Sequence, residues 1–386
     1  MQGPDQSGKT ESKARPVKKS DWFLLIAVSL FILSFAVLYF ALPDTAFSSL
    51  ENRSLQKRPS VSVDSVLTGR FSEELDDFYT DQLPARKFFL SEKAFAELSM
   101  GKQENGRVIL ALNGYLVKRL EYPDLSELEK NLGTLKAFSE KTEAMGIRTI
   151  TAIAPRTVDE LDEFLPDWFD TSYAAQAWQT VEDSGLSFMD FRPYLKETSK
   201  TGFWYKTDHH WTTTGAYVAY SMICSSFSCM PSQDYERVTV TEDFKGTSYS
   251  ASGMYWTSGE PLVLFRYPGD QSFDVKIDGD PAPFEGFYDL TAPGRGQGYE
   301  IFFGGNYARL SIRSGEAGRP KLLVFKDSFA NSVLPFLAQQ FDLEVVDLRY
   351  CRESVRSLIE EISPDCILVL YGLDTLSSPA FLPKLS

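Results

Sequence analysis

The sequence predicts an α/β fold with a mostly parallel sheet covered by helices on both faces. Apolar, strand-like runs alternate with segments of helical periodicity, which is typical of parallel sheets. Hydrophobic residues make up 43% of the 386 residues, which is enough for a large packed core. The regular elements that we expect are strands at 148–154, 186–191, 321–325, 343–347 and 366–371, and helices at 125–144, 171–183, 213–224, 329–340 and 353–361.

An uncharged run of 21 residues, 22–42, lies near the N-terminus. Its length matches the roughly 20 residues that cross a bilayer as a helix. Five lysine and arginine residues precede it, which favours a cytoplasmic N-terminus and an extracellular C-terminal domain. The alternative is a cleaved signal peptide, whose apolar region is normally shorter. We therefore expect a single-pass protein of the cell membrane.

Composition suggests the remaining boundaries. Residues 1–21 are polar and are expected to form a disordered cytoplasmic tail. Residues 43–99 read as a stalk and helical lead-in, with helical pieces broken at Pro84. The main domain is expected over 100–386. Within it, residues 237–315 are rich in glycine, proline and aromatic residues, which predicts an irregular or β insertion.

Charge and cysteine usage exclude some classes of function. The net charge of −14 disfavours nucleic-acid binding, which needs a basic surface, and no nucleic-acid partner is expected. The four cysteines do not have the spacing of a zinc site. Cys224 and Cys229 are close enough to bridge a small loop outside the cell. Cys366 lies in an apolar run and is expected to be buried.

The only two histidines of the chain are neighbours, in Asp208-His209-His210-Trp211. In an extended segment residues i and i+2 share a face, so Asp208 and His210 should point together, with His209 opposite. A carboxylate placed in this way holds the imidazole tautomer and stabilises the imidazolium ion. One alternative is a structural histidine pair with a capping aspartate. Another is a metal site, but the chain has no HExxH or similar ligand spacing, and no metal is expected.

A second signal is Ser328, which follows the apolar run 321–325. The carboxyl ends of parallel strands carry reactive residues in α/β folds, and a helix start supplies backbone N–H donors for an oxyanion. Ser328, a histidine and an aspartate together are the parts of a serine nucleophile with its base and orienter. The alternative is that Asp327 and Ser328 are ordinary helix caps. Ser332, one turn further on, is a weaker candidate nucleophile.

Other residues are candidates for supporting roles. Gly305 and Asn306 can approach an oxyanion and donate to it, although the motif alone favours a simple turn between two strands. Lys326 can lower the pKa of the serine, bind an anionic group or point into solvent. Six aromatic residues are candidates for lining a sugar-binding groove, with core packing as the alternative: Trp204, Tyr205, Trp211, Tyr217, Tyr255 and Trp256.

The motifs Asp208-His209-His210-Trp211 and Lys326-Asp327-Ser328-Phe329, in this order, resemble the bacterial DHHW proteins. These are similar to the SGNH-hydrolase-like proteins that O-acetylate alginate and other exopolysaccharides. The resemblance covers about residues 48–386. Further matching pieces are Glu51-Asn52-Arg53, Asp81-Gln82-Leu83-Pro84-Ala85-Arg86, Gly114-Tyr115-Leu116, Gly304-Gly305-Asn306 and Asp347-Leu348-Arg349-Tyr350.

The resemblance implies an SGNH-hydrolase-like fold with Ser328 as nucleophile, His210 as base and Asp208 as orienter. The aspartate–histidine pair precedes the serine, as in the alginate group and in contrast to ordinary SGNH hydrolases. Lys326 stands where ordinary SGNH motifs have glycine. Candidates for oxyanion or substrate binding are Asn306, Gly305, Lys326, His209 and Trp211.

The implied function is an extracytoplasmic, membrane-anchored O-acetyltransferase that moves acetyl groups to a cell-surface or secreted polysaccharide through an acyl-serine. The resemblance also implies a membrane-bound O-acyltransferase as the partner that supplies acetyl groups. No cofactor is expected. Two alternatives stand beside this one: a carbohydrate acetyl-esterase that uses the same triad, and a non-catalytic glycan-binding export or scaffold protein.

Overall fold

The structure is a computed structural model that describes residues 18–119, 124–198, 200–378 and 382–385. The chain divides into two compact units. The N-terminal unit comprises Met1–Ser48 and Ser54–Arg86, and the main unit comprises Ser49–Arg53 and Lys87–Ser386.

The N-terminal unit contains the long helix α1 (Lys19–Ala41), whose side chains are largely exposed. By length and composition this helix can cross a membrane, although a signal sequence has the same properties. The expected stalk after it contains a short helix, α2 (Val63–Leu67), which is capped by the side chain of Ser62 because this side chain accepts a hydrogen bond from the Ser65 N–H. Helix α3 (Arg70–Asp81) follows.

The described part of the main unit is built around an eight-stranded sheet with the order β10-β9-β11-β13-β12-β14-β5-β6. The strands from β13 to β6 are parallel, and β11, β9 and β10 continue the sheet antiparallel. The strand bounds are β5 (Arg148–Ala154), β6 (Met189–Asp190), β9 (Asp274–Ile277), β10 (Asp280–Pro281), β11 (Arg309–Arg313), β12 (Lys321–Lys326), β13 (Asp342–Val346) and β14 (Cys366–Gly372). The predicted mostly parallel sheet is confirmed, and part of residues 237–315 extends its edge.

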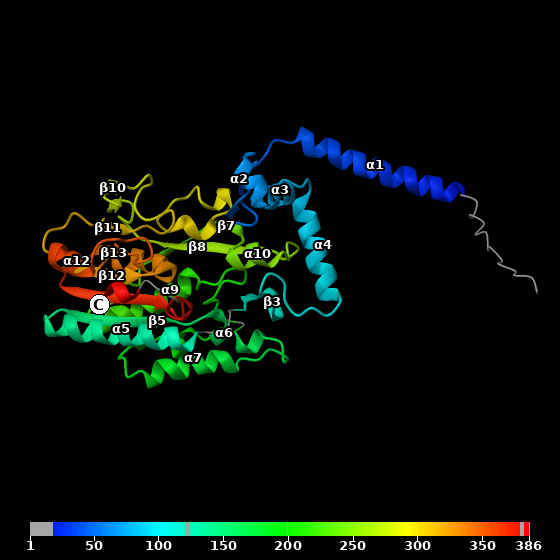
Figure 1. The fold of residues 1–386 in the computed structure, drawn as a ribbon. Coiled ribbons are helices and arrows are strands. Elements are labelled where there is room, and N and C mark those ends of the chain that lie inside the picture. Colours follow the sequence, from blue (N-terminus) through cyan, green and yellow to red (C-terminus); the bar gives the residue numbers. More distant parts are fainter. Residues whose placement is uncertain (1–17, 120–123, 199, 379–381, 386) are drawn as a thin grey trace, which may run out of the picture. The chain divides into compact units, whose positions relative to one another are not determined.

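Helices cover both faces of the sheet, as the alternating strand side chains require. Leu323 and Phe325 of β12 pack into one core with α5 (Leu125–Ala144), α7 (Ser172–Asp183) and α12 (Val355–Ile362). Leu322 and Val324 pack into the other core, with α9 (Thr213–Ser226) and α11 (Leu334–Leu337). Figure 1 shows α5 and α7 running beside each other along the sheet.

Smaller elements complete the described main unit. These are α4 (Arg86–Ser99), the hairpin of β3 (Val108–Leu110) and β4 (Leu116–Lys118), α6 (Thr157–Glu160), α8 (Arg192–Leu195), the hairpin of β7 (Glu236–Phe244) and β8 (Glu260–Arg266), α10 (Thr247–Ser252) and α13 (Leu373–Leu376).

Residues 329–340 do not form the single helix that the sequence predicts. The chain forms a 3-10 turn at Ser328–Ser332 and then the short helix α11. Pro335 lies in the first turn of α11, and a proline there cannot continue a helix from residue 331 because it lacks an N–H and clashes with the carbonyl four residues back. The nucleophile candidate therefore sits on a tight turn, and the expected benefit of a long helix dipole is absent.

Candidate active site

The two sequence motifs meet at the carboxyl end of the parallel strands. Ser328 lies two residues after the last residue of β12, and Asp208 and His210 lie in the irregular segment before α9. The buried carboxylate of Glu197 holds the start of that segment, because it accepts hydrogen bonds from the N–H groups of Gly202, Phe203 and Trp204 at 2.9, 2.6 and 2.8 Å. A bridge between Trp204 and Trp211 closes the segment into a loop.

Asp208, His210 and Ser328 form one hydrogen-bonded chain. The Ser328 Oγ atom lies 2.8 Å from His210 Nε2, and His210 Nδ1 lies 2.6 Å from Asp208 Oδ1. An ionised carboxylate can only accept, so Nδ1 of His210 carries the proton and Nε2 accepts from the serine hydroxyl. This is the protonation pattern that a histidine base needs to take a proton from serine.

The carboxylate of Asp208 is buried and fully engaged. Its Oδ1 atom also accepts the His210 N–H at 2.9 Å, and its Oδ2 atom accepts the N–H and hydroxyl of Thr247 at 2.7 and 3.1 Å. Burial opposes the charged form, but the two imidazoles and these hydrogen bonds hold the pKa of Asp208 well below its usual range. Gly246 leaves the room that this arrangement needs, since a Cβ atom there would overlap the carboxylate.

Tyr299 supports the base and was not predicted. Its ring stacks on His210 with 3.8 Å between centroids and 3° between planes. Its hydroxyl lies 3.3 Å from the Ser328 carbonyl oxygen and 3.1 Å from Ser332 Oγ. Burial raises the pKa of Tyr299 well above its usual value, so the ring stays neutral. In the sequence Tyr299 is one aromatic residue within a glycine-rich segment, and no local pattern distinguishes it.

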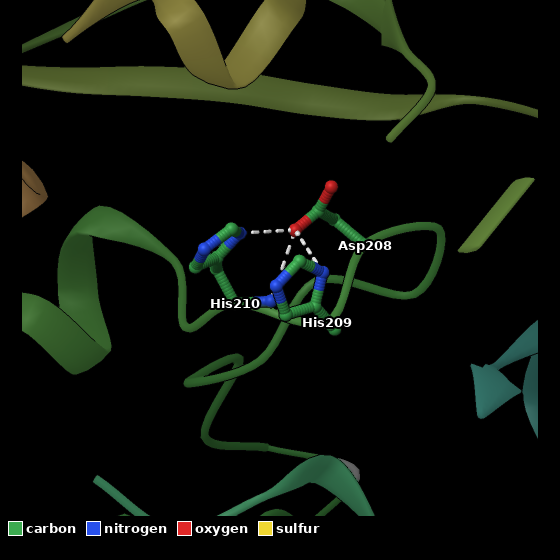
Figure 2. A group of neighbouring side chains, drawn as sticks. All are labelled: Asp208, His209 and His210. Atoms are coloured by element: carbon green, nitrogen blue, oxygen red, sulfur yellow. Dashed lines mark hydrogen bonds and ion pairs between the residues drawn. The ribbon is translucent and has the colours of Figure 1, made fainter. Parts of the chain in front are cut away.

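His209 does not point away from His210, and the predicted orientation is wrong. The two imidazole centroids are 3.8 Å apart, and His209 Nδ1 lies 3.6 Å from Asp208 Oδ1 (Figure 2). The rule for i and i+2 applies to extended chain, whereas this segment bends where the Asp208 side chain accepts the His210 N–H.

Trp211 is buried and cannot contact a substrate, which corrects its prediction as a binding residue. Its indole N–H lies 3.1 Å from the Phe329 carbonyl oxygen and 2.9 Å from Ser332 Oγ. Trp211 therefore holds the turn that carries Ser328. Ser332 is buried in the same contacts, which removes it as a rival nucleophile.

Lys326 neither points into solvent nor offers its charge to a ligand. Its buried ammonium group donates to Asn306 Oδ1 and Asn331 Oδ1, both at 2.7 Å, and lies 3.9 Å from Asp347 Oδ2. Burial lowers the pKa of Lys326 to about 8, and the carboxylate of Asp347 opposes this shift. Asn331, which was not predicted, belongs to the turn after Ser328, so Lys326 ties that turn to the loop of Asn306.

Some of the candidate donors for an oxyanion site already donate a hydrogen bond within the protein, and others do not. The N–H of Gly305 donates to the Phe302 carbonyl oxygen at 3.4 Å, and the N–H of Phe329 donates to Asp327 at 3.0 Å. Within the described residues the N–H of Ser328 makes no hydrogen bond. The Asn306 oxygen is occupied by Lys326 and Asn331, while its NH₂ group donates to no described residue.

The predicted aromatic groove is largely absent. Trp204 and Tyr205 are buried in the core together with Trp211, and Tyr255 is buried in a separate, smaller cluster, since large rings contribute much of the apolar surface of a core. Tyr217 packs against the same core, and Trp256 is 43% exposed.

Asp208, His209 and His210 each place one possible ligand atom within 4.8 Å of the others, a grouping that can hold a metal ion. The 2.6 Å between His210 Nδ1 and Asp208 Oδ1 is a hydrogen-bond distance. Two tetrahedral ligands at about 2 Å from one zinc ion lie about 3.3 Å apart. The geometry of these side chains thus fits a shared proton better than a shared metal.

Two family models match the chain. Residues 116–258 match an SGNH hydrolase-like domain, acetyltransferase AlgX, and residues 193–346 match DHHW protein. No curated protein shows significant similarity to the sequence.

Solved structures share the fold at low sequence identity. A DHHW family protein from Eubacterium siraeum has a TM-score of 0.61 at 18% identity and covers 73% of this chain and 95% of its own. PatB1 from Bacillus cereus, solved with a sulfonyl adduct, has a TM-score of 0.57 at 20% identity and covers 70% of this chain and 99% of its own. Two overlapping stretches of the chain thus match an SGNH hydrolase-like domain and DHHW protein, in agreement with the resemblance that the two motifs indicated.

Proposed function

We propose that this protein is an extracytoplasmic, membrane-anchored O-acetyltransferase that moves acetyl groups to a cell-surface or secreted polysaccharide through an acyl-serine. The observation that carries the proposal is the hydrogen-bonded chain from Ser328 through His210 to Asp208. The match of residues 116–258 to the SGNH hydrolase-like domain of the acetyltransferase AlgX supports acetyl transfer as the reaction at this serine.

In the first step His210 Nε2 takes the Ser328 hydroxyl proton while the serine oxygen attacks the carbonyl carbon of the acetyl donor. The negative oxygen of the tetrahedral intermediate is stabilised by the Ser328 N–H and the Asn306 NH₂ group, which donate to no residue that the structure describes. The donor's leaving group departs with the proton from His210, and Ser328 keeps the acetyl group.

In the second step a sugar hydroxyl gives its proton to His210 and its oxygen attacks the acyl carbon. The bond to Ser328 then breaks, and the serine oxygen takes the proton back from His210. The ionised Asp208 stabilises the imidazolium ion that forms in each step, and its fixed hydrogen bonds keep it in place.

Helix α1 supports the anchor, because it is long and apolar enough to span a bilayer, and the basic residues before it favour an external main unit. The family resemblance supports a polysaccharide acceptor and a membrane-bound O-acyltransferase as the acetyl supplier.

Labelling with a sulfonyl fluoride tests the nucleophile. The purified full-length protein should gain one adduct on Ser328, and Ser328→Ala should gain none. Ser225→Ala, which changes an exposed serine on α9, serves as the matched control. In cells, Ser328→Ala should remove acetate from the surface polysaccharide. Unchanged polymer acetylation in a strain that carries only Ser328→Ala overturns the transferase proposal.

A further inference from the structure

His209 is a second imidazole, next to His210, that the proposed triad does not use. Its Nδ1 atom lies 2.6 Å from Thr247 Oγ1, and the Thr247 hydroxyl donates to Asp208 Oδ2. Because that hydroxyl has one proton and gives it to the carboxylate, Nδ1 of His209 must be the donor to Thr247. His209 is therefore the neutral tautomer with its proton on Nδ1 and a lone pair on Nε2.

The Nε2 atom of His209 is the ring nitrogen that carries no proton in this tautomer. It makes no hydrogen bond to any residue that the structure describes. The His209 side chain is 28% exposed, whereas that of His210 is 4% exposed. The His209 ring lies next to that of His210, with 3.8 Å between centroids and 38° between planes, and its centroid is 6.0 Å from that of Phe329, the residue after the nucleophile.

The surroundings keep His209 neutral. Burial and the neighbouring His210 lower the pKa of His209 to about 3, while Asp208 opposes the shift and Lys118 adds to it. A neutral Nε2 accepts hydrogen bonds from hydroxyl groups and has nothing to offer the acetyl carbonyl oxygen, which is itself an acceptor. The chemistry of this position therefore matches an alcohol, the second substrate of an acyl transfer.

Building on the acyl-serine mechanism proposed above, we propose that His209 forms the subsite for the acceptor carbohydrate, with Nε2 accepting a hydrogen bond from a sugar hydroxyl next to the one that attacks. The attacking hydroxyl still gives its proton to His210. His209 exchanges no proton and forms no bond to the acyl group. It orients the sugar, so that the acyl-serine passes to a carbohydrate in preference to water.

The test uses two variants of the full-length protein in detergent micelles. His209→Asn keeps an N–H donor at the Nδ1 position for Thr247 but has no group at Nε2. His209→Gln places its amide close to the Nε2 position and can present an oxygen there. With p-nitrophenyl acetate as donor, the nitrophenol burst reports acylation of Ser328. The ratio of acetyl ester to free acetate reports the acceptor, with propane-1,2-diol, propan-1-ol and cellopentaose as probes.

We expect His209→Asn to keep the nitrophenol burst. Its rate of transfer to cellopentaose and to the diol, relative to hydrolysis, should fall about tenfold, because this factor corresponds to the free energy of one hydrogen bond. Transfer to propan-1-ol, which has one hydroxyl, should change little, and His209→Gln should recover part of the loss. An unchanged ratio in His209→Asn, or a burst lost without any change in folding, overturns this subsite and leaves the acyl-serine proposal standing. If the wild-type protein gives no burst, the proposed function itself fails.

Discussion

The hydroxyl oxygen of Ser328 lies 2.8 Å from Nε2 of His210, although 118 positions separate the two residues. A contact made by the residue next to His210 helps to explain why these two distant segments are held together. Trp211, next to the base, donates its indole N–H to the turn that follows the nucleophile, at Phe329 and Ser332. The buried indole thus joins the two motifs in a second place, so that the base and the nucleophile are held by a shared core contact.

The first prediction concerns the orienting carboxylate. Asp208→Asn should lower the rate of acetyl-ester turnover by about 10³- to 10⁴-fold, because an amide NH₂ at this position favours the wrong imidazole tautomer. Stopped-flow measurement of the nitrophenol burst checks this. Asp243→Asn, an exposed aspartate on β7, is the matched control and should retain full activity. A burst rate within a few-fold of the wild type in Asp208→Asn contradicts an orienting role.

Gly246 is predicted to be intolerant of a side chain. In Gly246→Ala the new methyl group would overlap the Asp208 carboxylate and displace it from His210, so turnover should fall by about 100-fold or more. Gly133→Ala is the contrasting change, because Gly133 lies inside α5 with open space around it. It should leave turnover unchanged and stabilise the fold by up to about 1 kcal/mol. Turnover and thermal unfolding of both variants decide the point, and an active Gly246→Ala enzyme would show that the carboxylate has room to move.

Lys326 is predicted to act by positioning Asn306. Lys326→Met removes the ammonium donor to both amide oxygens and leaves the Asn306 oxygen only the 3.2 Å contact with the Asn331 amide. We expect kcat to fall by about 10- to 100-fold with little change in KM, since an oxyanion donor acts in the transition state. Lys321→Met, at the exposed start of the same strand, should behave as the wild type. A change confined to KM would place Lys326 in substrate binding instead.

The same lysine predicts a pH dependence of stability. Burial lowers the pKa of Lys326 to about 8 in the folded protein, against about 10.4 for an unfolded lysine. Between these values the unfolded chain binds more protons, so the free energy of unfolding should rise with pH by up to about 1.4 kcal/mol per unit from this group. Urea unfolding from pH 7.5 to 10 should show this slope in the wild type and lose it in Lys326→Met. If the free energy of unfolding rises equally with pH in the two proteins, the lowered pKa of Lys326 is refuted.

Cys224 and Cys229 are predicted to form a disulfide when a thiol oxidant such as oxidised glutathione is present. Their sulfur atoms lie 2.7 Å apart, at the end of α9 and just beyond it. Oxidation should remove the mass of two hydrogen atoms and link the two peptides, while Cys351 and Cys366 stay reduced. The double change to serine should lower stability by about 2 kcal/mol relative to the oxidised protein, as expected for so short a loop. Full alkylation of Cys224 and Cys229 after oxidation and unfolding would exclude the bridge.

Sequence reasoning reached the fold class because it depends on patterns that are local to the chain. The helix at 125–144 and the strand at 148–154 agree with α5 and β5 at both ends, since each follows from the period of its own apolar residues. The motif around Ser328 could be placed at the end of a strand for the same reason, and the scarcity of histidine restricted the base to two residues.

The sequence by itself therefore determined most of the regular elements, the mostly parallel sheet and a short list of candidate reactive residues. Tertiary structure alone decided how the supporting side chains are used. Tyr299 stacks on His210, Trp211 holds the turn of Ser328, and Lys326 turns inward to Asn306. These contacts join segments far apart in sequence, and no local periodicity records which distant partner a buried ring or ammonium group will meet. The orientation of His209 escaped prediction for a related reason, because one side-chain hydrogen bond from Asp208 bends the backbone away from the extended form.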